Sequence, residues 1–170
     1  MKKQFLIILS LFVLTVSLNA QNEIPAYRAT GYKGSVSVTD MGLLWNGVET
    51  SQGYMLNDQF YLGGGAGMLI GAVGKVAYAG RVFADVQSYW FPHKSTLTSG
   101  IRVGYLRNFS GETDNLEVDI TVGWSWGLAS GHGLSVNAGL CAVFPAGISY
   151  VAINLPHVSL APVLSVAFEF

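Results

Sequence analysis

Apolar and polar residues alternate along much of this chain, most clearly in the stretch LEVDITVGWSWGL (116–128). Its even positions are apolar or aromatic, and its odd positions are acidic, small or hydroxyl-bearing. Successive side chains of a β-strand point to opposite faces, so this pattern predicts a strand with one apolar face and one polar face. Trp124 and Trp126 lie on the apolar face, whereas Glu117 and Asp119 lie on the polar face.

The same period predicts eight strands along the chain. They cover residues 32–42, 48–56, 60–70, 79–90, 98–109, 116–128, 134–144 and 158–170. Each is close to the roughly 9–11 residues that a tilted strand needs to cross the hydrocarbon of a bilayer, or slightly longer. Asn, Asp, Gly and Ser gather between the strands, as in LNDQF and NFSGETDN, and these residue types favour turns.

The direction of the apolar face separates two kinds of barrel. A soluble barrel encloses its apolar side chains, whereas a transmembrane barrel turns them toward lipid around a polar interior. Here the polar face carries paired acids and glycines, and the apolar face carries tryptophan. The pattern therefore predicts an all-β protein, an eight-stranded antiparallel up-and-down transmembrane β-barrel that closes so that no strand edge meets lipid. A soluble periplasmic barrel that binds an apolar ligand is an alternative.

An even number of strands places both termini at one end of the barrel, which is periplasmic in an outer-membrane protein. Residues 57–59, 91–97 and 129–133 are then predicted as periplasmic turns. Outer loops are predicted near 43–47, 71–78, 110–115 and 145–157. Aromatic residues prefer membrane interfaces, so we expect two girdles of them. The predicted interfacial aromatics are Tyr54, Phe60, Trp90, Trp126, Phe168 and Phe170 at the periplasmic rim, with Trp45 and Phe144 at the outer rim.

The first twenty residues have the form of a secretory signal peptide. Lys2 and Lys3 precede the apolar run FLIILSLFVLTV, which is shorter than a typical transmembrane helix, and SLNA ends on small Ala20. We therefore predict a signal peptide over residues 1–20, a short periplasmic segment over 21–31 and the barrel over 32–170. This organisation predicts export to the outer membrane, and a retained signal anchor is the alternative.

Composition narrows the possible functions. Apolar residues make up 51% of the chain and charged residues 11%, with no basic run, so nucleic acid is not an expected partner. Cys141 is the single cysteine, so no disulfide framework is expected. His93 and His132 lie in predicted turns without metal-ligand spacing. We expect a monomer with no cofactor, no metal and no catalytic residue.

Alternation also assigns eight charged side chains to the barrel interior. An eight-stranded barrel is only wide enough to be filled by side chains, and buried charges require partners. We therefore predict a packed polar lumen without an open pore, and an ion or proton pathway is the alternative. Asp85 is expected beside Arg102, and Lys33 is expected to reach Glu169 across the seam between the first and last strands. The predicted lumen charge network is Lys33, Glu49, Arg81, Asp85, Arg102, Glu117, Asp119 and Glu169.

Three stretches, GYKGSVSV (31–38), ETSQGYMLNDQFYLGGGAGM (49–68) and RVFADVQSYWF (81–91), with the closing VAFEF, resemble the small outer-membrane barrels with OmpX- and OmpA-like transmembrane domains. The resemblance spans about residues 32–170. It implies a non-enzymatic protein that stabilises the membrane or interacts at the surface. The implied partners are outer-membrane lipid, lipopolysaccharide, the outer-membrane insertion machinery and periplasmic chaperones.

The C-terminal strand carries the insertion signal that this resemblance implies. In such barrels a terminal Phe follows hydrophobic residues at every second position, and the matching residues here are Leu164, Val166, Phe168 and Phe170. Pro162 lies in the same strand and cannot donate to a β-ladder, so a bulge or local distortion is expected there.

Two motifs indicate other chemistry. His157 and Ser159 resemble the His-x-Ser of the lipid A deacylase barrels, which would make the protein an outer-leaflet lipid-modifying enzyme. Alternation turns both side chains away from lipid, so this function is kept as an alternative. GGGAG (63–67), followed by Asp85, has the spacing of a dinucleotide-binding loop, but no helical pattern follows it.

Overall fold

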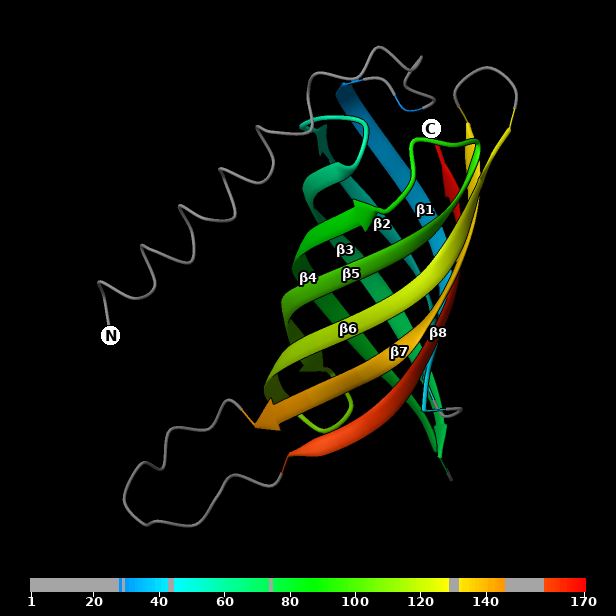
Figure 1. The fold of residues 1–170 in the computed structure, drawn as a ribbon. Helices are drawn as coiled ribbons and strands as arrows, with labels where there is room; N and C mark the ends of the chain where they lie inside the picture. Colours follow the sequence, from blue (N-terminus) through cyan, green and yellow to red (C-terminus); the bar gives the residue numbers. More distant parts are fainter. Residues whose placement is uncertain (1–27, 29, 43–44, 74, 129–131, 146–157) are drawn as a thin grey trace.

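The computed structural model describes residue 28 and residues 30–42, 45–73, 75–128, 132–145 and 158–170. It is an all-β protein with eight strands, the number that the alternation predicts (Figure 1). No helix within these ranges has the length and hydropathy needed to cross a membrane. The predicted signal peptide (1–20) and most of the predicted periplasmic segment (21–31) lie outside them. The strands are β1 Gly31–Met41, β2 Trp45–Met55, β3 Phe60–Val73, β4 Lys75–Tyr89, β5 Ser95–Asn108, β6 Thr113–Gly127, β7 Gly133–Pro145 and β8 Ser159–Glu169.

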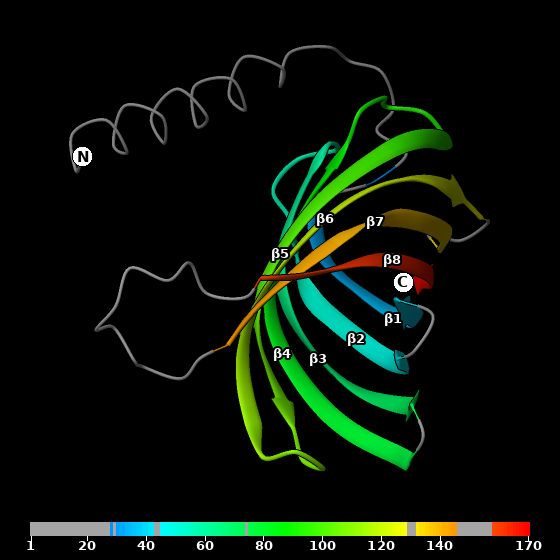
Figure 2. The ribbon, with the colours of Figure 1, turned by 90° about the horizontal axis from the view of Figure 1, so that it is seen from below.

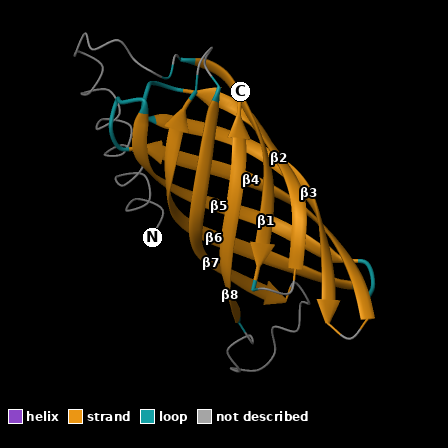
Figure 3. Ribbon diagram, turned by 90° about the vertical axis from the view of Figure 1, so that its right-hand side faces the viewer, coloured by secondary structure: helices purple, strands orange, loops and turns teal. Residues whose placement is uncertain are grey.

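The eight strands form one closed barrel. Each pairs antiparallel with the next, and β8 pairs with β1 (Figure 2). Paired residues followed once around the barrel from Gly31 return to β1 at Met41, which is 41 − 31 = 10 residues further along. With a rise of about 3.3 Å per residue and about 4.8 Å between strands, this stagger tilts the strands by about 41°. Figure 3 shows the tilt. The path runs through Gly31, Met55, Tyr61, Gln87, Gly100, Thr121, Gly139, Val163 and Met41.

The seam between β1 and β8 extends to Phe170. The Gly34 N–H donates to the Phe170 carbonyl at 2.8 Å, and the Phe170 N–H donates to the Gly34 carbonyl at 2.9 Å. A Cβ at Gly34 would lie 2.6 Å from the Phe170 ring. Because Gly34 has no side chain, the Phe170 ring can pack against the outer face of β1.

The expectation of a bulge at Pro162 is wrong. β7 and β8 keep one register from Ser159, paired with Val143, to Glu169, and Pro162 lies opposite Leu140 within it. The Pro162 carbonyl accepts a hydrogen bond from the Gly42 N–H at 2.7 Å, so this side of the residue faces the chain just past the end of β1. The missing proline N–H therefore interrupts no ladder.

Several strands are longer than the alternation predicts, because they extend further toward the loops. β2 begins at Trp45 instead of residue 48, and β5 and β6 each begin three residues earlier than expected, at Ser95 and Thr113. The predicted outer loop over 71–78 belongs to the β3–β4 hairpin, which is paired as far as Val73 and Lys75. Glycine and alanine are frequent in that stretch, so the contrast between apolar and polar positions fades although the backbone remains paired.

The barrel is apolar on its outer surface and carries buried charged side chains in its interior. On β6, Leu116, Ile120 and Val122 are exposed on the outer surface, whereas Glu117 and Asp119 are buried in the interior. The soluble alternative requires apolar side chains inside and polar ones outside. The observed arrangement is the inverse, so that alternative is wrong.

Candidate functional site

The interior is layered between two ends of the barrel. We call the end where β1 begins and β8 finishes the terminal end, and the opposite end the loop end (Figure 1). At the terminal end, Lys33 Nζ lies 3.0 Å from Glu169 Oε2. The Tyr89 hydroxyl donates to Glu169 Oε1 at 3.2 Å, and Lys33 Nζ donates to the same hydroxyl. Lys33 and Glu169 are thus in contact across the seam.

Arg28 covers this polar cluster from the terminal end. Its guanidinium carbon lies 4.4 Å from the centre of the Tyr89 ring, within the range of a cation–π contact. Nη2 donates to the Ser125 hydroxyl at 2.8 Å, and Nη1 donates to the His93 carbonyl at 3.2 Å. The sequence analysis did not identify Arg28, because it precedes the first strand and no alternation marks it.

Arg81 is the centre of the middle layer. Its Nη1 donates to Glu49 Oε1 at 3.0 Å and its Nη2 to Asp119 Oδ2 at 2.5 Å, while Nε lies 2.7 Å from Glu117 Oε1. The four side chains come from β2, β4 and β6 and are almost fully buried. One guanidinium therefore contacts three carboxylates inside the barrel.

A second arginine extends this network toward the terminal end. Arg102 Nη1 donates to Glu49 Oε2 at 3.1 Å, so Glu49 bridges the two arginines. Arg102 Nε lies 3.5 Å from Asp85 Oδ2, and these residues are paired on β4 and β5. The hydroxyl of Ser51 and the amide of Gln87 donate to the same Asp85 oxygen at 3.0 and 2.9 Å. The structure thus brings six of the eight predicted lumen charges into one network and the other two into the terminal cluster.

Phe83 fills the space between the two arginines. Its ring centre lies 5.1 Å from the guanidinium carbon of Arg81 and 4.9 Å from that of Arg102. A Cβ at Gly65 on β3 would lie 2.7 Å from Phe83 Cε2, so the ring requires glycine there. Phe83 was not among the predicted lumen residues, because these were all charged. Its odd position on β4 already indicated that it points inward.

Four carboxylates face two guanidinium groups in the middle layer. The contact between Arg81 Nε and Glu117 Oε1 has no aligned hydrogen bond, so it is electrostatic. Glu117, Asp119 and Cys141 also bring potential metal-ligand atoms within 4.8 Å of one another. Arg81 contacts both of these acids and supplies there the positive charge that a metal ion would bring. The donor set is therefore the acidic side of an ion-paired network.

The described cavities beside this network are small. Two cavities of about 10 Å³ each lie next to Arg102, and Asn137 also lines both. A cavity of this size has room for about one water molecule.

The loop end of the interior is apolar, which the sequence analysis did not anticipate. The buried cluster consists of Met41, Leu69, Ala79, Leu106, Cys141 and Val163, with Trp45, Val143 and Ala161 packed against it. All of these residues occupy inward positions of their strands. Apart from Trp45, these residues fall at inward positions of the period-two pattern, but the expectation of a polar lumen excluded them.

Trp45 does not belong to the outer aromatic girdle, so that part of the prediction is wrong. It is the first residue of β2, and its side chain packs against the apolar cluster inside the barrel. A Cβ at Gly71 on β3 would lie 2.9 Å from Trp45 Cδ2, so the indole rests on this glycine. The error arose because β2 was expected to begin at residue 48, which left Trp45 in a loop.

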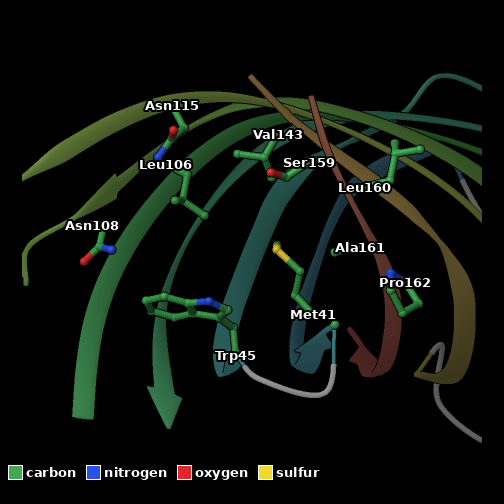
Figure 4. A pocket seen from close by; sticks show the side chains of 11 residues that line it. Met41, Trp45, Leu106, Asn108, Asn115, Val143, Ser159, Leu160, Ala161 and Pro162 are labelled. Carbon is green, nitrogen blue, oxygen red and sulfur yellow. The ribbon is translucent and has the colours of Figure 1, made fainter. Parts of the chain in front are cut away.

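A cavity of about 370 Å³ lies against the apolar cluster at the loop end, and residues of the cluster form part of its wall (Figure 4). Its wall is mostly aliphatic and aromatic, with three polar side chains from β5, β6 and β8. The lining residues are Met41, Gly42, Trp45, Leu106, Asn108, Asn115, Val143, Ser159, Leu160, Ala161 and Pro162.

The remaining predicted aromatics lie near the strand ends. Phe60 and Phe144 are half-buried, whereas the others are exposed on the outer surface; these are Tyr54, Trp90, Trp126, Phe168 and Phe170. The four residues of the predicted insertion signal all point outward from β8 or its end; they are Leu164, Val166, Phe168 and Phe170.

Neither of the two alternative motifs forms its expected site among the described residues. Ser159 begins β8 and lines the large cavity, but His157 lies outside the described residues. The described lining of that cavity contains no acid and no histidine beside Ser159. Gly63 and Gly67 lie within β3, so GGGAG does not open a helix as a dinucleotide-binding loop would.

No protein-family model matches this sequence, and no curated protein matches it. Among solved structures, the crystal structure of Neisserial surface protein A (NspA) is similar, with a TM-score of 0.52 and 12% identical residues. The match covers 82% of this chain and 94% of that chain. At this level of identity the similarity concerns the fold. The chain thus has the closed, eight-stranded antiparallel barrel found among the small outer-membrane proteins.

Proposed function

We propose that this protein is an integral outer-membrane barrel with a structural or surface-interacting role, without an open pore and without catalysis. The observation that carries the proposal is the inverted arrangement of the barrel, with apolar side chains outside and ion pairs inside. Water disfavours an apolar surface of this extent, whereas the hydrocarbon of a bilayer accommodates it. A closed ladder also satisfies the backbone hydrogen bonds of the strands where water is absent.

The aromatic residues at the terminal end support a position at a membrane interface. Tyr54, Trp126 and Trp90 are exposed there, and the Trp90 Nε1 donates to the Ser99 hydroxyl at 3.1 Å. Tryptophan combines a large apolar ring with one polar N–H, which suits the boundary between hydrocarbon and water. Both termini of an outer-membrane barrel lie on the periplasmic side, so the terminal end is periplasmic in this proposal.

The interior supports the absence of a pore. Arg28 covers the terminal cluster, the Arg81 and Arg102 network fills the middle, and an apolar cluster lies between this network and the loop end. An ion that crossed the barrel would have to displace paired charges and then pass an apolar layer. The same packing leaves no described cleft where the predicted lumen charges could act on a substrate.

The proposed partners follow from the outer surface. Arg107 is exposed near the loop end, where its ion pair with Asp114 at 3.2 Å leaves donors for lipopolysaccharide phosphates. The outward apolar positions of β8 are the side that the insertion machinery would read after delivery by periplasmic chaperones. The closed barrel pairs each strand with two neighbours and leaves no full-length edge strand for a second copy, which favours a monomer.

Two measurements on the purified protein test this proposal. In planar bilayers, the inserted protein is expected to give no conductance steps above the lipid baseline, and regular open-channel steps would contradict the sealed lumen. Incubation with lipopolysaccharide is expected to release no fatty acid. Release that is lost in Ser159→Ala would contradict the non-enzymatic role.

A further inference from the structure

At the loop end of the seam, β8 extends beyond the last residue of β1. β1 ends at Met41, which pairs with Val163, whereas β8 continues four residues further to Ser159 and pairs there with β7. Among the described residues, one backbone hydrogen bond joins the sides beyond this point, from Gly42 to Pro162. Within the described part of the chain, the barrel wall therefore has a notch between the end of β1 and the overhanging part of β8.

The large cavity opens at this notch. Ala161 lines it from the inner side of β8, whereas Leu160 and Pro162 line it from the outer side (Figure 4). Leu160 is 70% exposed on the surface that we propose faces lipid. The cavity is thus continuous from the interior residues Met41 and Leu106 to the outer apolar surface.

The lining suits the apolar tail of an amphiphile, and its few polar atoms lie toward the loops. Its floor and sides are apolar, with the Trp45 ring along one side, and its described lining carries no charged side chain. Polar atoms are confined to Asn108, Asn115 and Ser159, which lie where their strands approach the loops. The volume of about 370 Å³ is within the usual range of small-molecule sites.

We propose that this cavity binds one acyl chain of an outer-leaflet membrane lipid, which enters sideways through the notch between β1 and β8. The proposal rests on the proposed membrane insertion, because the opening then faces the hydrocarbon of the outer leaflet. The acyl chain covers the apolar floor and contacts Trp45, while the polar part of the lipid remains near Asn108, Asn115 and Ser159. A water-soluble ligand has no charged group to recognise in this lining.

Trp45 provides a direct test, because its side chain lies inside the barrel and the other tryptophans do not line the cavity. The full chain is prepared with Trp45 as its single tryptophan, by changing Trp90, Trp124 and Trp126 to Phe. It is inserted into vesicles of phosphatidylcholine with brominated acyl chains, and its fluorescence is compared with that in unbrominated vesicles. A second variant keeps only Trp124, which points outward.

The expected result is a loss of Trp45 fluorescence as large as the loss for Trp124. Ala161→Phe fills the cavity and should abolish the loss, and Val143→Phe provides a second filled variant. Ala84→Phe adds the same ring on the outer surface of β4 and should leave the loss unchanged. A difference in gel mobility between boiled and unboiled samples shows that each variant is folded.

The outcomes separate this inference from the proposed function. Quenching of Trp124 without quenching of Trp45 would overturn the acyl-chain site while supporting membrane insertion. This result is expected if residues of this chain occupy the cavity. Quenching of Trp45 that persists in both filled variants would also overturn the site. Failure to quench Trp124 would contradict membrane insertion itself.

Discussion

The ammonium group of Lys33 lies 3.0 Å from a carboxylate oxygen of Glu169, and this ion pair joins the first and last strands inside the barrel. The two side chains are mostly buried and share the Tyr89 hydroxyl. The contact therefore stabilises closure at the seam, where strands most distant in sequence must meet.

Lys33→Met is expected to destabilise the folded barrel by about 3 kcal/mol, because it leaves the Glu169 carboxylate buried without its cation. The free energy of unfolding in urea, measured in lipid vesicles, tests this. The double variant Lys33→Met, Glu169→Gln should recover part of the loss, since both charges are then removed. A double variant no more stable than Lys33→Met would contradict an interaction across the seam.

Arg81→Met is expected to destabilise the barrel more than Lys33→Met does, lowering the free energy of unfolding by about 3–5 kcal/mol. The substitution leaves three carboxylates close together without the guanidinium that contacts them. Arg107→Met is the matched control, because its ion pair with Asp114 is exposed and should contribute less than about 1 kcal/mol. Similar urea midpoints for the two variants would show that the network does not stabilise the barrel.

Gly34→Val is expected to displace the Phe170 ring and weaken the β1–β8 seam. The added Cβ would meet the ring at 2.6 Å, which is too close for carbon atoms without movement. Gly111→Ala is the control, since its Cβ would meet nothing nearer than 3.4 Å. The unfolding rate in detergent should rise for Gly34→Val alone, and equal rates for the two variants would contradict tight packing at the seam.

Ile120→Arg tests which surface faces lipid. Ile120 is exposed in the middle of β6, so an arginine there should cost about 2–4 kcal/mol if the residue lies near the bilayer midplane. Ser110→Arg, in the exposed turn between β5 and β6, should cost about 1 kcal/mol or less, because it removes only an exposed hydrogen bond from the Tyr78 N–H. The yield of folded protein in vesicles measures both effects, and equal yields would indicate that Ile120 does not face lipid.

The number of strands and the inner and outer faces were predictable from the sequence because the side-chain period of a strand is two. β6 illustrates this, since its acids alternate with large apolar residues over most of its length. Strand ends were less predictable where glycine and alanine remove the contrast, as in the β3–β4 hairpin. Trp45 was misassigned because the polarity is reversed at the start of β2, where the inward Trp45 is apolar and the outward Asn46 is polar.

The contacts inside the barrel depend on the stagger of the strands, which no local pattern contains. Alternation placed Glu49, Arg81 and Asp119 inside, but their convergence requires the register of β2 through β6. The notch at the seam likewise results from the offset between β1 and β8, which have equal lengths but pair only from Ser35–Glu169 to Met41–Val163.

The mobility of the protein in SDS gels, with and without boiling after folding into lipid vesicles, tests the central claim most directly. A closed barrel that lipid stabilises is expected to stay folded in SDS until it is boiled, so the unboiled band should run faster. Equal mobility, from protein that also stays in solution without detergent or lipid, would contradict an apolar surface in contact with the membrane.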